Sequence, residues 1–206
     1  MLLSGGIDSA TSLFLTRKRG YRAHALTFRF GGMAASELRA SVAVSIAARV
    51  KQRVVRLPDL REASDIEGAG FPGLPPTYIP MRNSIYYSLA ASYAEELRAD
   101  CIVGGHTKDD LKVFRDAGPA FFASLEEAFW AGSKILSGKR TRILRPLRLM
   151  SKPEVIKLAA SLDVPLELTW SCHRDGAVHC WRCQGCQGRL RSFERAGVPD
   201  PLRNRV

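Results

Sequence analysis

Residues 3–12 read Leu-Ser-Gly-Gly-Ile-Asp-Ser-Ala-Thr-Ser, and these residues indicate the class of fold. It is typical of a strand end, a glycine turn and a helix start in immediate succession. Gly5 and Gly6 let the backbone take positive φ and leave room for a ligand against bare main chain. Ser4, Ser9 and the first N–H groups of the following helix can then point at an anion, which the helix dipole favours. The stretch therefore predicts a phosphate-binding loop.

Asp8 is the unusual member of this loop, because a carboxylate repels the phosphate groups beside it. Its presence is explained if the carboxylate holds a Mg²⁺ ion that neutralises the phosphates. The loop does not follow the G-x-x-x-x-G-K-[ST] pattern of P-loop enzymes, and an ordinary turn with a helix cap is the alternative interpretation. We expect Asp8 and Ser9 to be catalytic, and Ser4, Gly5 and Gly6 to complete the nucleotide cradle.

Composition limits the class of protein. A chain of 206 residues is within the size of one domain with one core. Its 31 Lys and Arg against 20 Asp and Glu give a net charge of +11, which favours anionic partners such as nucleotides or RNA. No long apolar run and no secretory leader pattern are visible, so we expect a cytoplasmic protein without membrane contact. Five cysteines in such a protein indicate metal or thiol chemistry before disulfides.

Hydrophobic periodicity alternates between strand and helix along the chain. After the short apolar segment 1–3, the pattern predicts strands over 23–30, 53–57, 101–105 and 142–147, and helices over 8–19, 37–50, 82–97, 121–130 and 151–162. Such alternation is typical of β-α-β units. The sequence therefore predicts an α/β fold with an open parallel sheet and helices on both faces. We expect an ATP-binding domain over 1–165 and a small, helical, zinc-binding lobe over 166–206 that packs on it.

Two loops are expected to border the site. Residues 58–80 are rich in Pro and Gly, and a long loop of this kind in a compact domain is more often functional than idle, so we expect a flap. Residues 104–110 follow a predicted buried strand, where open parallel sheets bind their ligands. Gly105 is predicted to contact the nucleotide. His106, Lys108, Asp109 and Asp110 are candidates for nucleotide or metal contacts, with a solvated charged loop as the alternative.

A second motif lies near the carboxyl end. Cys172, Cys180, Cys183 and Cys186 have the spacing C-x7-C-x2-C-x2-C, which lets neighbouring thiolates bind one ion tetrahedrally. Four thiolates make a closed structural zinc site that would fold an otherwise polar tail. An iron–sulfur cluster and disulfides are the alternatives. Because four cysteines complete the shell, His173 and His179 are expected to be exposed neighbours.

Three segments together carry a family resemblance. They are Ser-Gly-Gly-Ile-Asp-Ser at 4–9, Ile-Pro-Met-Arg-Asn at 79–83 and Leu-Thr-Trp-Ser-Cys at 168–172. In combination they resemble the 7-cyano-7-deazaguanine synthase family of PP-loop ATP pyrophosphatases, which have an adenine nucleotide alpha-hydrolase-like fold. The resemblance implies an enzyme of queuosine or archaeosine biosynthesis that uses ATP and ammonia to convert 7-carboxy-7-deazaguanine into an amide and then a nitrile. It also implies a structural zinc ion and a homodimer.

The resemblance suggests which residues contact the ligands. Leu26, Thr27 and Phe28, at the end of the second strand, would border adenine. Arg82 and Asn83 could hold a carboxylate, a phosphate or a purine-like edge, since Arg offers a planar fork and Asn offers both donors and acceptors. We therefore predict a nucleotide site and a substrate site at neighbouring strand ends.

Other predicted contacts are open to two interpretations. Trp170 offers a flat face for the deazaguanine ring, or else is a core tryptophan that covers the zinc lobe. Asp110 and Asp116 are predicted to be catalytic, and Phe114 to contact substrate. The runs 29–34 and 114–119 depart from the residues usual in the family.

These departures keep two other functions open. One is a related enzyme that joins an adenylated carboxylate to another amine, on a protein or a nucleic acid, or that thiolates tRNA. The other is a binding module with a vestigial nucleotide site and a basic zinc tail that binds RNA. The intact glycine loop argues against this last function.

Overall fold

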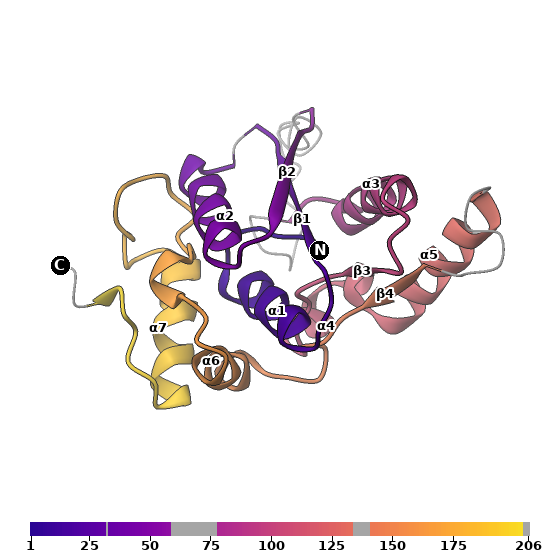
Figure 1. Cartoon of the computed structure of the whole chain (residues 1–206). Helices are drawn as coiled ribbons and strands as arrows, with labels where there is room; N and C mark the ends of the chain where they lie inside the picture. The colour runs from indigo at the N-terminus through magenta and orange to yellow at the C-terminus, as the bar shows by residue number, and fades with distance from the viewer. Residues whose placement is uncertain (32, 59–77, 134–140, 204–206) are drawn as a thin grey trace.

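The computed structural model describes residues 1–31, 33–58, 78–133 and 141–203, and its centre is a parallel sheet (Figure 1). Strand β1 (His24–Arg29) pairs in parallel with β2 (Lys51–Arg56), and β3 (Cys101–Val103) pairs in parallel with β4 (Arg142–Leu144). All four strands lie where the hydrophobic pattern predicts them, with small shifts at their ends. The predicted α/β class with a parallel sheet is confirmed.

The short segment at residues 1–3 joins the two strand pairs into one sheet. The backbone N–H of Leu2 donates to the carbonyl of Val103 at 2.9 Å, and that of Leu3 donates to the carbonyl of Leu26 at 2.9 Å. The order across the described sheet is therefore β2, β1, residues 1–3, β3, β4. The glycine loop, residues 4–9, consequently leaves the central position of the sheet at its carboxyl edge.

Helices cover both faces of this sheet, as predicted. On one face lie α1 (Ile7–Lys18) and α2 (Ala35–Ala47); on the other lie α3 (Arg82–Glu96) and α5 (Pro119–Gly132) (Figure 1). Each face has its own apolar core. The first core includes Leu13, Val44 and Ile156, and the second includes Tyr87, Phe122 and Ile143.

The carboxyl-terminal part packs against the first face. Helix α6 (Lys152–Ser161) contacts α1, and α7 (Gln184–Ala196) contacts α6. Phe193 and Ala196 of α7, in the tail that is expected to be mostly polar, are buried in the same core as α1. The apolar packing thus runs across the predicted boundary between residues 165 and 166, which stays a prediction.

Short elements complete the described chain. The 3-10 turn η2 (Leu166–Leu168) precedes the cysteine loop, while α4 (Asp110–Val113) and η1 (Arg115–Ala117) follow β3 and were not expected from the pattern. Of the predicted flap, residues 59–77 lie outside the described residues. None of the described helices is long and apolar enough to cross a membrane.

Candidate active site and metal centre

A pocket of about 350 Å³ lies at the carboxyl edge of the sheet. Its walls come from the glycine loop, β1, the start of α3 and the segment that follows β3. Most of the predicted site residues line it, namely Ser4, Gly6, Asp8, Ser9, Leu26, Phe28, Arg82, Asn83, Gly105, Asp110, Phe114 and Asp116.

Hydrogen bonds within the loop fix its shape. The Ser4 and Ser9 hydroxyls are 3.1 Å apart, and the Ser9 hydroxyl donates to the carbonyl of Gly6 at 3.0 Å. The N–H of Gly6 donates to the Ser4 hydroxyl at 3.3 Å. Both serines therefore hold the loop open in front of the first turn of α1, whose N–H groups suit an anion.

Two glycines are required by close packing. Gly5 has a φ of +86°, and a Cβ there would lie 2.6 Å from the Ser41 backbone nitrogen of α2. A Cβ on Gly105 would lie 2.9 Å from the backbone nitrogen of Ser9. The loop is thus held between α2 and the segment after β3, with its main chain bare toward the pocket. This is the geometry that a phosphate cradle needs.

Asp8 faces a lysine that the sequence did not single out. The ammonium of Lys152, the first residue of α6, donates to Asp8 Oδ2, and the Lys152 backbone N–H donates to Asp109 Oδ2 at 3.1 Å. Burial raises the pKa of Asp8, and Lys152 opposes this rise. Burial alone would lower the pKa of Lys152, but the carboxylates of Asp8 and Asp110 raise it. Lys152 is therefore a cation at the glycine loop.

The donor set fits the Mg²⁺ ion expected here. Asp8 Oδ1 is buried and has no hydrogen-bond partner within the described part of the chain. A buried carboxylate oxygen without a partner is unfavourable, and a hard cation that prefers oxygen ligands would satisfy it. Asp8 therefore fits its predicted role as a magnesium ligand.

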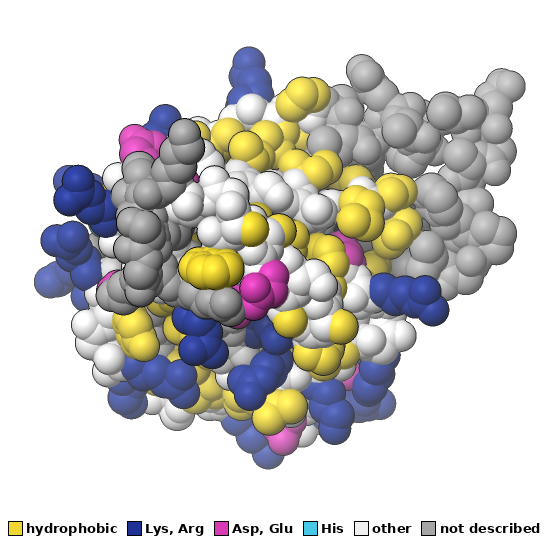
Figure 2. Space-filling model, turned by 90° about the vertical axis from the view of Figure 1, so that its right-hand side faces the viewer, with side chains coloured by type: hydrophobic (Ala, Val, Ile, Leu, Met, Phe, Trp, Pro, Cys, Tyr) yellow, Lys and Arg dark blue, Asp and Glu magenta, His cyan; other side chains and the backbone are white. Residues whose placement is uncertain are grey.

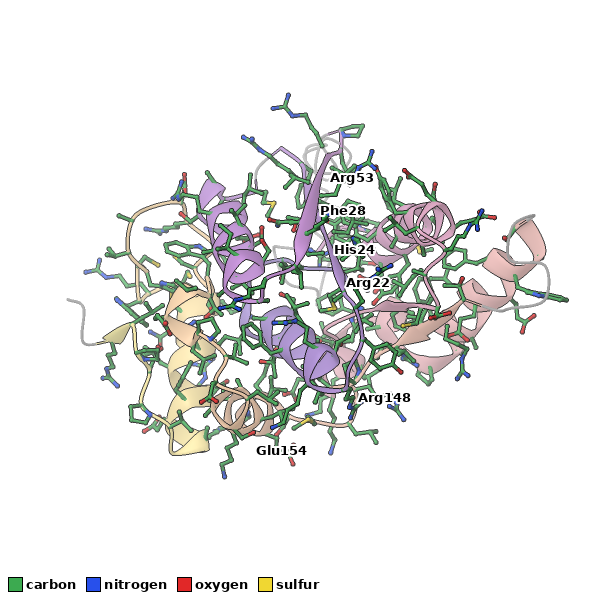
Figure 3. All side chains as sticks on the ribbon, in the orientation of Figure 1. Arg22, His24, Phe28, Arg53, Arg148 and Glu154 are labelled. Carbon is green, nitrogen blue, oxygen red and sulfur yellow. The ribbon has the colours of Figure 1, made fainter. Side chains whose placement is uncertain are left out.

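Aromatic side chains form two walls of the pocket. Phe28 on β1 (Figure 3) stacks on Tyr86 of α3 with ring centroids 4.6 Å apart, and the rings of Tyr78 and Phe114 stack with centroids 6.1 Å apart. Phe30 and Met33, from the run that departs from the family pattern, also line the pocket. The sequence patterns did not indicate Tyr78 or Tyr86, because only the fold brings Tyr86 onto Phe28 of β1 and Tyr78 onto Phe114. Flat aromatic walls suit a purine-like ring.

The start of α3 meets the segment after β3 at this pocket. The N–H of Asn83 donates to Asp116 Oδ2 at 3.3 Å, and Asn83 Nδ2 donates to the Asp116 carbonyl at 3.0 Å. Asp110 Oδ2 accepts from the N–H and the hydroxyl of Thr107, at 2.7 and 2.8 Å. Both carboxylates therefore hold backbone in place at the pocket wall, beside Arg82. Their catalytic roles stay predictions.

His106 and Tyr87 form the inner end of the pocket. Their rings are 5.8 Å apart, and burial lowers the pKa of His106 to about 4. Burial also raises the pKa of Tyr87, whose hydroxyl has no partner among the described residues. At neutral pH the two groups are therefore uncharged and can exchange hydrogen bonds with a bound ring.

Three predicted residues lie outside this pocket. Gly5 packs behind the loop, and the Thr27 hydroxyl points away to donate to the Leu3 carbonyl at 2.6 Å. Trp170 lies on the far side of the loop, where its backbone N–H donates to the Gly5 carbonyl at 3.0 Å and its ring centroid lies 4.3 Å from that of His179. The structure thus does not bring Trp170 together with Arg82, and we leave it out of the substrate site.

The expectation that His179 is an exposed neighbour of the cysteines is wrong. The side chain is buried between Trp170 and Trp181, and its Nε2 accepts from the Ser171 N–H at 3.0 Å. Burial lowers its pKa to about 4. The neutral ring therefore serves as packing and as a hydrogen-bond acceptor. His173 is exposed, as expected.

The four cysteines meet in one place. The Sγ atoms of Cys172, Cys180, Cys183 and Cys186 all lie within 4.8 Å of one another. Cys180 and Cys186 are 3.9 Å apart, and Cys172 and Cys183 are 3.8 Å apart. Zinc–sulfur bonds of about 2.3 Å in a tetrahedron place the sulfurs about 3.8 Å apart, so the cluster fits one zinc ion. A disulfide bond needs a distance of about 2.05 Å between its two sulfur atoms, which is much shorter than the distances here. A four-iron cluster binds each of its four thiolates through a different iron ion and not through one shared ion.

Backbone groups prepare this centre for a cation. The N–H groups of Arg182 and Cys183 lower the pKa of Cys180 to about 6. Burial raises the pKa of Cys172 and Cys186. A bound metal ion would deprotonate these two thiols and stabilise the thiolates, which links metal binding to folding of the loop.

A buried ion pair fastens the lobe that carries the cysteines. Arg189 of α7 binds Asp200 with two bonds, from Nε at 2.7 Å and from Nη2 at 2.9 Å. Its remaining N–H groups donate to the Thr169 hydroxyl at 2.8 Å and the Leu166 carbonyl at 3.1 Å. This one side chain therefore joins α7, the segment before the cysteines and the tail after α7.

Positive charge is spread over the face of the molecule that Figure 2 shows. Figure 2 shows Lys and Arg side chains around one face, separated by apolar and polar groups. Such a distribution differs from the continuous basic groove with stacked aromatics that tracks single-stranded nucleic acid. The charge on this face therefore adds nothing to the RNA-binding alternative.

The fold and the site define a class: an adenine nucleotide alpha-hydrolase-like protein with a four-cysteine cluster. Solved structures share this fold. The NMN synthetase from Francisella tularensis superposes with a TM-score of 0.53 at 16% identity, over 96% of this chain and 76% of that one. A predicted subunit of tRNA methyltransferase from Methanocaldococcus jannaschii superposes with a TM-score of 0.54 at 20% identity, over 77% and 74%.

The family follows from the sequence comparisons. Residues 1–197 match the family model described as queuosine biosynthesis protein QueC. A 7-cyano-7-deazaguanine synthase from Thermoplasma volcanium is 35% identical over 98% of this chain and 89% of its own length. The protein of that name from Thermosynechococcus vestitus is 35% identical over 98% and 93%. The chain belongs to the QueC family, which confirms the resemblance drawn from its motifs.

Proposed function

We propose that this protein uses ATP to convert 7-carboxy-7-deazaguanine and ammonia into 7-cyano-7-deazaguanine. One observation carries the proposal: a single pocket contains a phosphate-binding loop, aromatic walls and the polar pair Arg82 and Asn83. The relatives named above are 7-cyano-7-deazaguanine synthases, which supports this choice of substrate. The homodimer remains a prediction.

The reaction needs two activations. Forming a nitrile from a carboxylate and ammonia removes two oxygen atoms, and neither leaves readily as hydroxide. Attack of the carboxylate oxygen on the α-phosphorus of ATP releases diphosphate and gives an acyl adenylate. Ammonia then displaces AMP to form the amide. A second ATP activates the amide oxygen, and loss of AMP and protons leaves the nitrile.

The residues of this chain act mainly by positioning and by charge. Ser4, Ser9 and the loop N–H groups orient the phosphates, and Lys152 places a positive charge where the leaving group develops negative charge. Phe28 and Tyr86 would border the adenine ring of ATP. Mg²⁺ at Asp8 would supply charge neutralisation of the phosphates.

At the other end of the pocket, we assign substrate binding to the start of α3. Arg82 offers a planar fork to a carboxylate, and Asn83 is held in place by Asp116. His106, uncharged at neutral pH, is placed to accept from or donate to the base edge. Zinc at the four cysteines would hold the lobe and take no part in the chemistry, since four thiolates leave no open position.

A second function shares the same adenylation but uses another amine. It is favoured by the apolar Phe30 and Met33 and by Phe114, which line the pocket where the family usually carries other residues. An altered pocket wall can change the acceptor while the glycine loop stays the same. On this reading the acyl group would be joined to an amine of a protein or a nucleic acid.

One assay separates the two. The protein is incubated with ATP, Mg²⁺, ammonium and 7-carboxy-7-deazaguanine, and the products are followed by mass spectrometry. We expect AMP and the nitrile in a ratio of two to one. Accumulation of adenylate or amide without nitrile would favour the second function, and absence of AMP would contradict both. Arg82→Gln should abolish acid-dependent AMP formation, while the exposed Arg191→Gln serves as the control.

The metal is tested on the same preparation. We expect about one zinc ion per chain by elemental analysis, and loss of soluble protein in Cys183→Ser, because metal binding and folding of the lobe are coupled. Cys101→Ser is the matched control, since Cys101 lies in β3 away from the cluster. A folded native protein without metal would contradict the assignment.

A further inference from the structure

The inner end of the main pocket contains a buried hydroxyl group without a hydrogen-bond partner. The Tyr87 side chain on α3 is 0% exposed and lines the pocket, and its hydroxyl bonds to no other group among the described residues. Leaving such a group unpaired costs free energy, and folded proteins pair almost all of their buried hydroxyls. The place of this hydroxyl at a pocket therefore points to a ligand that completes its hydrogen bonding.

The backbone beside Tyr87 makes room for the hydroxyl. A Cβ on Gly104 would lie 1.8 Å from the Tyr87 oxygen, so a side chain at 104 would displace it. Gly105, the next residue, packs against the glycine loop, and a Cβ there would lie 2.9 Å from the backbone nitrogen of Ser9. Consecutive Cα atoms are about 3.8 Å apart. The hydroxyl and the loop are therefore close enough for one fused ring system with its substituent to contact both.

The groups around the hydroxyl favour an oxygen acceptor on the ligand. The guanidinium of Arg145 lies 4.4 Å from the ring centroid of Phe122, and this centroid lies 4.9 Å from that of Tyr87 and 5.1 Å from that of His106. Burial raises the pKa of Tyr87 and the charge of Arg145 opposes this rise, so the hydroxyl keeps its proton at neutral pH and can donate it to a hydrogen bond. A positive charge nearby stabilises the partial negative charge of a carbonyl oxygen more than an amino group.

We propose that Tyr87 determines which base this pocket accepts, by donating a hydrogen bond from its hydroxyl to the ring carbonyl oxygen of a guanine-type base. This assignment rests on the proposed function and names the part of the substrate that the inner end of the pocket recognises. His106, whose ring centroid is 5.8 Å from that of Tyr87, accepts from the ring N–H beside the carbonyl. The donor and the acceptor together match the edge of a guanine-type base, which presents an acceptor next to a donor.

This orientation also positions the reacting carboxylate. In 7-carboxy-7-deazaguanine the carboxylate is attached to the five-membered ring on the same side as the carbonyl oxygen, so the two groups are neighbours. A carbonyl bound at Tyr87 then places the carboxylate beside Gly104 and Gly105, toward the glycine loop. A base without the carbonyl would leave the hydroxyl unpaired and its carboxylate less well held. Selectivity and positioning therefore have the same origin.

Other placements of a ring explain the hydroxyl less well. The adenine ring of ATP has an amino group in place of the carbonyl, and the stacked rings of Phe28 and Tyr86 are the wall proposed for it. A second cavity, of about 280 Å³, lies behind the glycine loop among residues of α1, α6 and α7, but neither Tyr87 nor His106 lines it. A ligand that pairs with Tyr87 therefore occupies the inner end of the main pocket.

Calorimetry with two acids tests this assignment without turnover. 7-Carboxy-7-deazaguanine is compared with its 2,6-diamino analogue, which has an amino group in place of the carbonyl oxygen. The native protein should bind the first acid at least about 100-fold more tightly. Tyr87→Phe should lower this ratio at least about tenfold, because phenylalanine keeps the ring and removes only the donor. Tyr93→Phe, the same change on the same helix but outside the main pocket, should keep the ratio within about twofold.

Two further measurements separate recognition from a structural role. Tyr87→Phe removes a hydroxyl that is unpaired in the protein without ligand, so the midpoint of urea unfolding should stay the same or rise. The affinity of Tyr87→Phe for ATP should change less than about twofold, since adenine is assigned to another wall of the pocket. His106→Leu, which removes the acceptor, should weaken binding of 7-carboxy-7-deazaguanine at least about tenfold.

An unchanged ratio in Tyr87→Phe, equal affinity of the native protein for the two acids, or a lower urea midpoint in Tyr87→Phe would overturn the assignment. The proposed function fails on a different result. A native protein that prefers the guanine-type acid but forms no nitrile would lose the proposed function and keep the role of Tyr87. Nitrile formation together with an unchanged ratio in Tyr87→Phe would do the reverse.

Discussion

Two charge pairs in this protein have opposite surroundings. Arg189 and Asp200 have side chains only 0% and 3% exposed, and every guanidinium nitrogen has an acceptor. Lys152 and Asp8 are 38% and 23% exposed, and Asp8 Oδ1 has no partner within the described chain. A satisfied buried pair specifies structure, while an incompletely satisfied pair at a cavity can exchange its partner for a ligand. The first pair therefore stabilises the structure, and the second is the pair that we propose as part of the binding site.

The largest expected effect tests the binding pair. Asp8→Asn should lower turnover about 1,000-fold, because it removes the charge that holds the magnesium ion, which corresponds to about 4 kcal/mol in the transition state. The free energy of unfolding should change by less than about 1 kcal/mol, since the variant also removes an unsatisfied buried carboxylate. Steady-state AMP release and urea unfolding measure the two. Full activity would remove the magnesium assignment.

The next effect tests the structural pair. Arg189→Met should lower the free energy of unfolding by about 3–5 kcal/mol, because it leaves Asp200 buried without a partner. Arg189→Met combined with Asp200→Leu should recover part of this loss, since both charges are then absent. Urea unfolding of the two variants and the native protein gives the comparison. A loss below 1 kcal/mol in the single variant would end the distinction between the two pairs.

A smaller effect concerns the pH dependence of stability. His106 has its pKa lowered to about 4 by burial, against an ordinary value of 6.5. The unfolded chain therefore binds the proton first, and the free energy of unfolding falls as the pH decreases from about 6.5 toward 4. We expect His106 to account for about 1–2 kcal/mol between pH 7.5 and 5. His106→Gln should unfold with a correspondingly flatter pH profile, and an unchanged profile would contradict the burial of this ring.

The smallest effect concerns the helix that presents Lys152. The N–H of Ser151 donates to Glu154 Oε2 at 2.7 Å, and its hydroxyl to the same oxygen at 2.6 Å, in a capping box. Ser151→Ala should lower the free energy of unfolding by about 1 kcal/mol. Ser161→Ala, at the other end of α6, should change it by less than about 0.5 kcal/mol and is the matched control. Equal values for the two would mean that the cap does not hold the start of α6.

Local patterns predicted much of the molecule. The strands, the main helices, the glycine loop and the cysteine cluster each depend on residues close together in the chain. The loop needs two glycines beside a helix start. The predicted metal centre needs cysteines with two residues between them. Twelve of the fifteen predicted catalytic, nucleotide-binding and substrate-binding residues consequently line one pocket, because strand ends of a parallel sheet share one edge.

The remaining features depend on contacts between distant residues. Lys152 reaches Asp8 across 144 positions, and the sequence offered only a helix cap beside it. The motifs placed Thr27 in the adenine site and Trp170 in the substrate site. Successive side chains of a strand point to opposite faces, so the Thr27 hydroxyl points away from the pocket. The segment that carries Trp170 passes behind the glycine loop. His179 was expected to be exposed because four cysteines already complete the metal shell and leave no place for a histidine ligand. Packing between Trp170 and Trp181 buries it instead.

Short spacings thus indicated the family, the glycine loop predicted to bind phosphate and the four cysteines predicted to bind a metal ion, because each depends on residues close together in the chain. Which side chains face the pocket, which charge pair is satisfied and where a second cavity lies behind the loop depend instead on how distant elements pack together. Burial and pairing are properties of elements packed against one another, and the residues of α1, α6 and α7 that line the cavity behind the loop come together only in the folded chain.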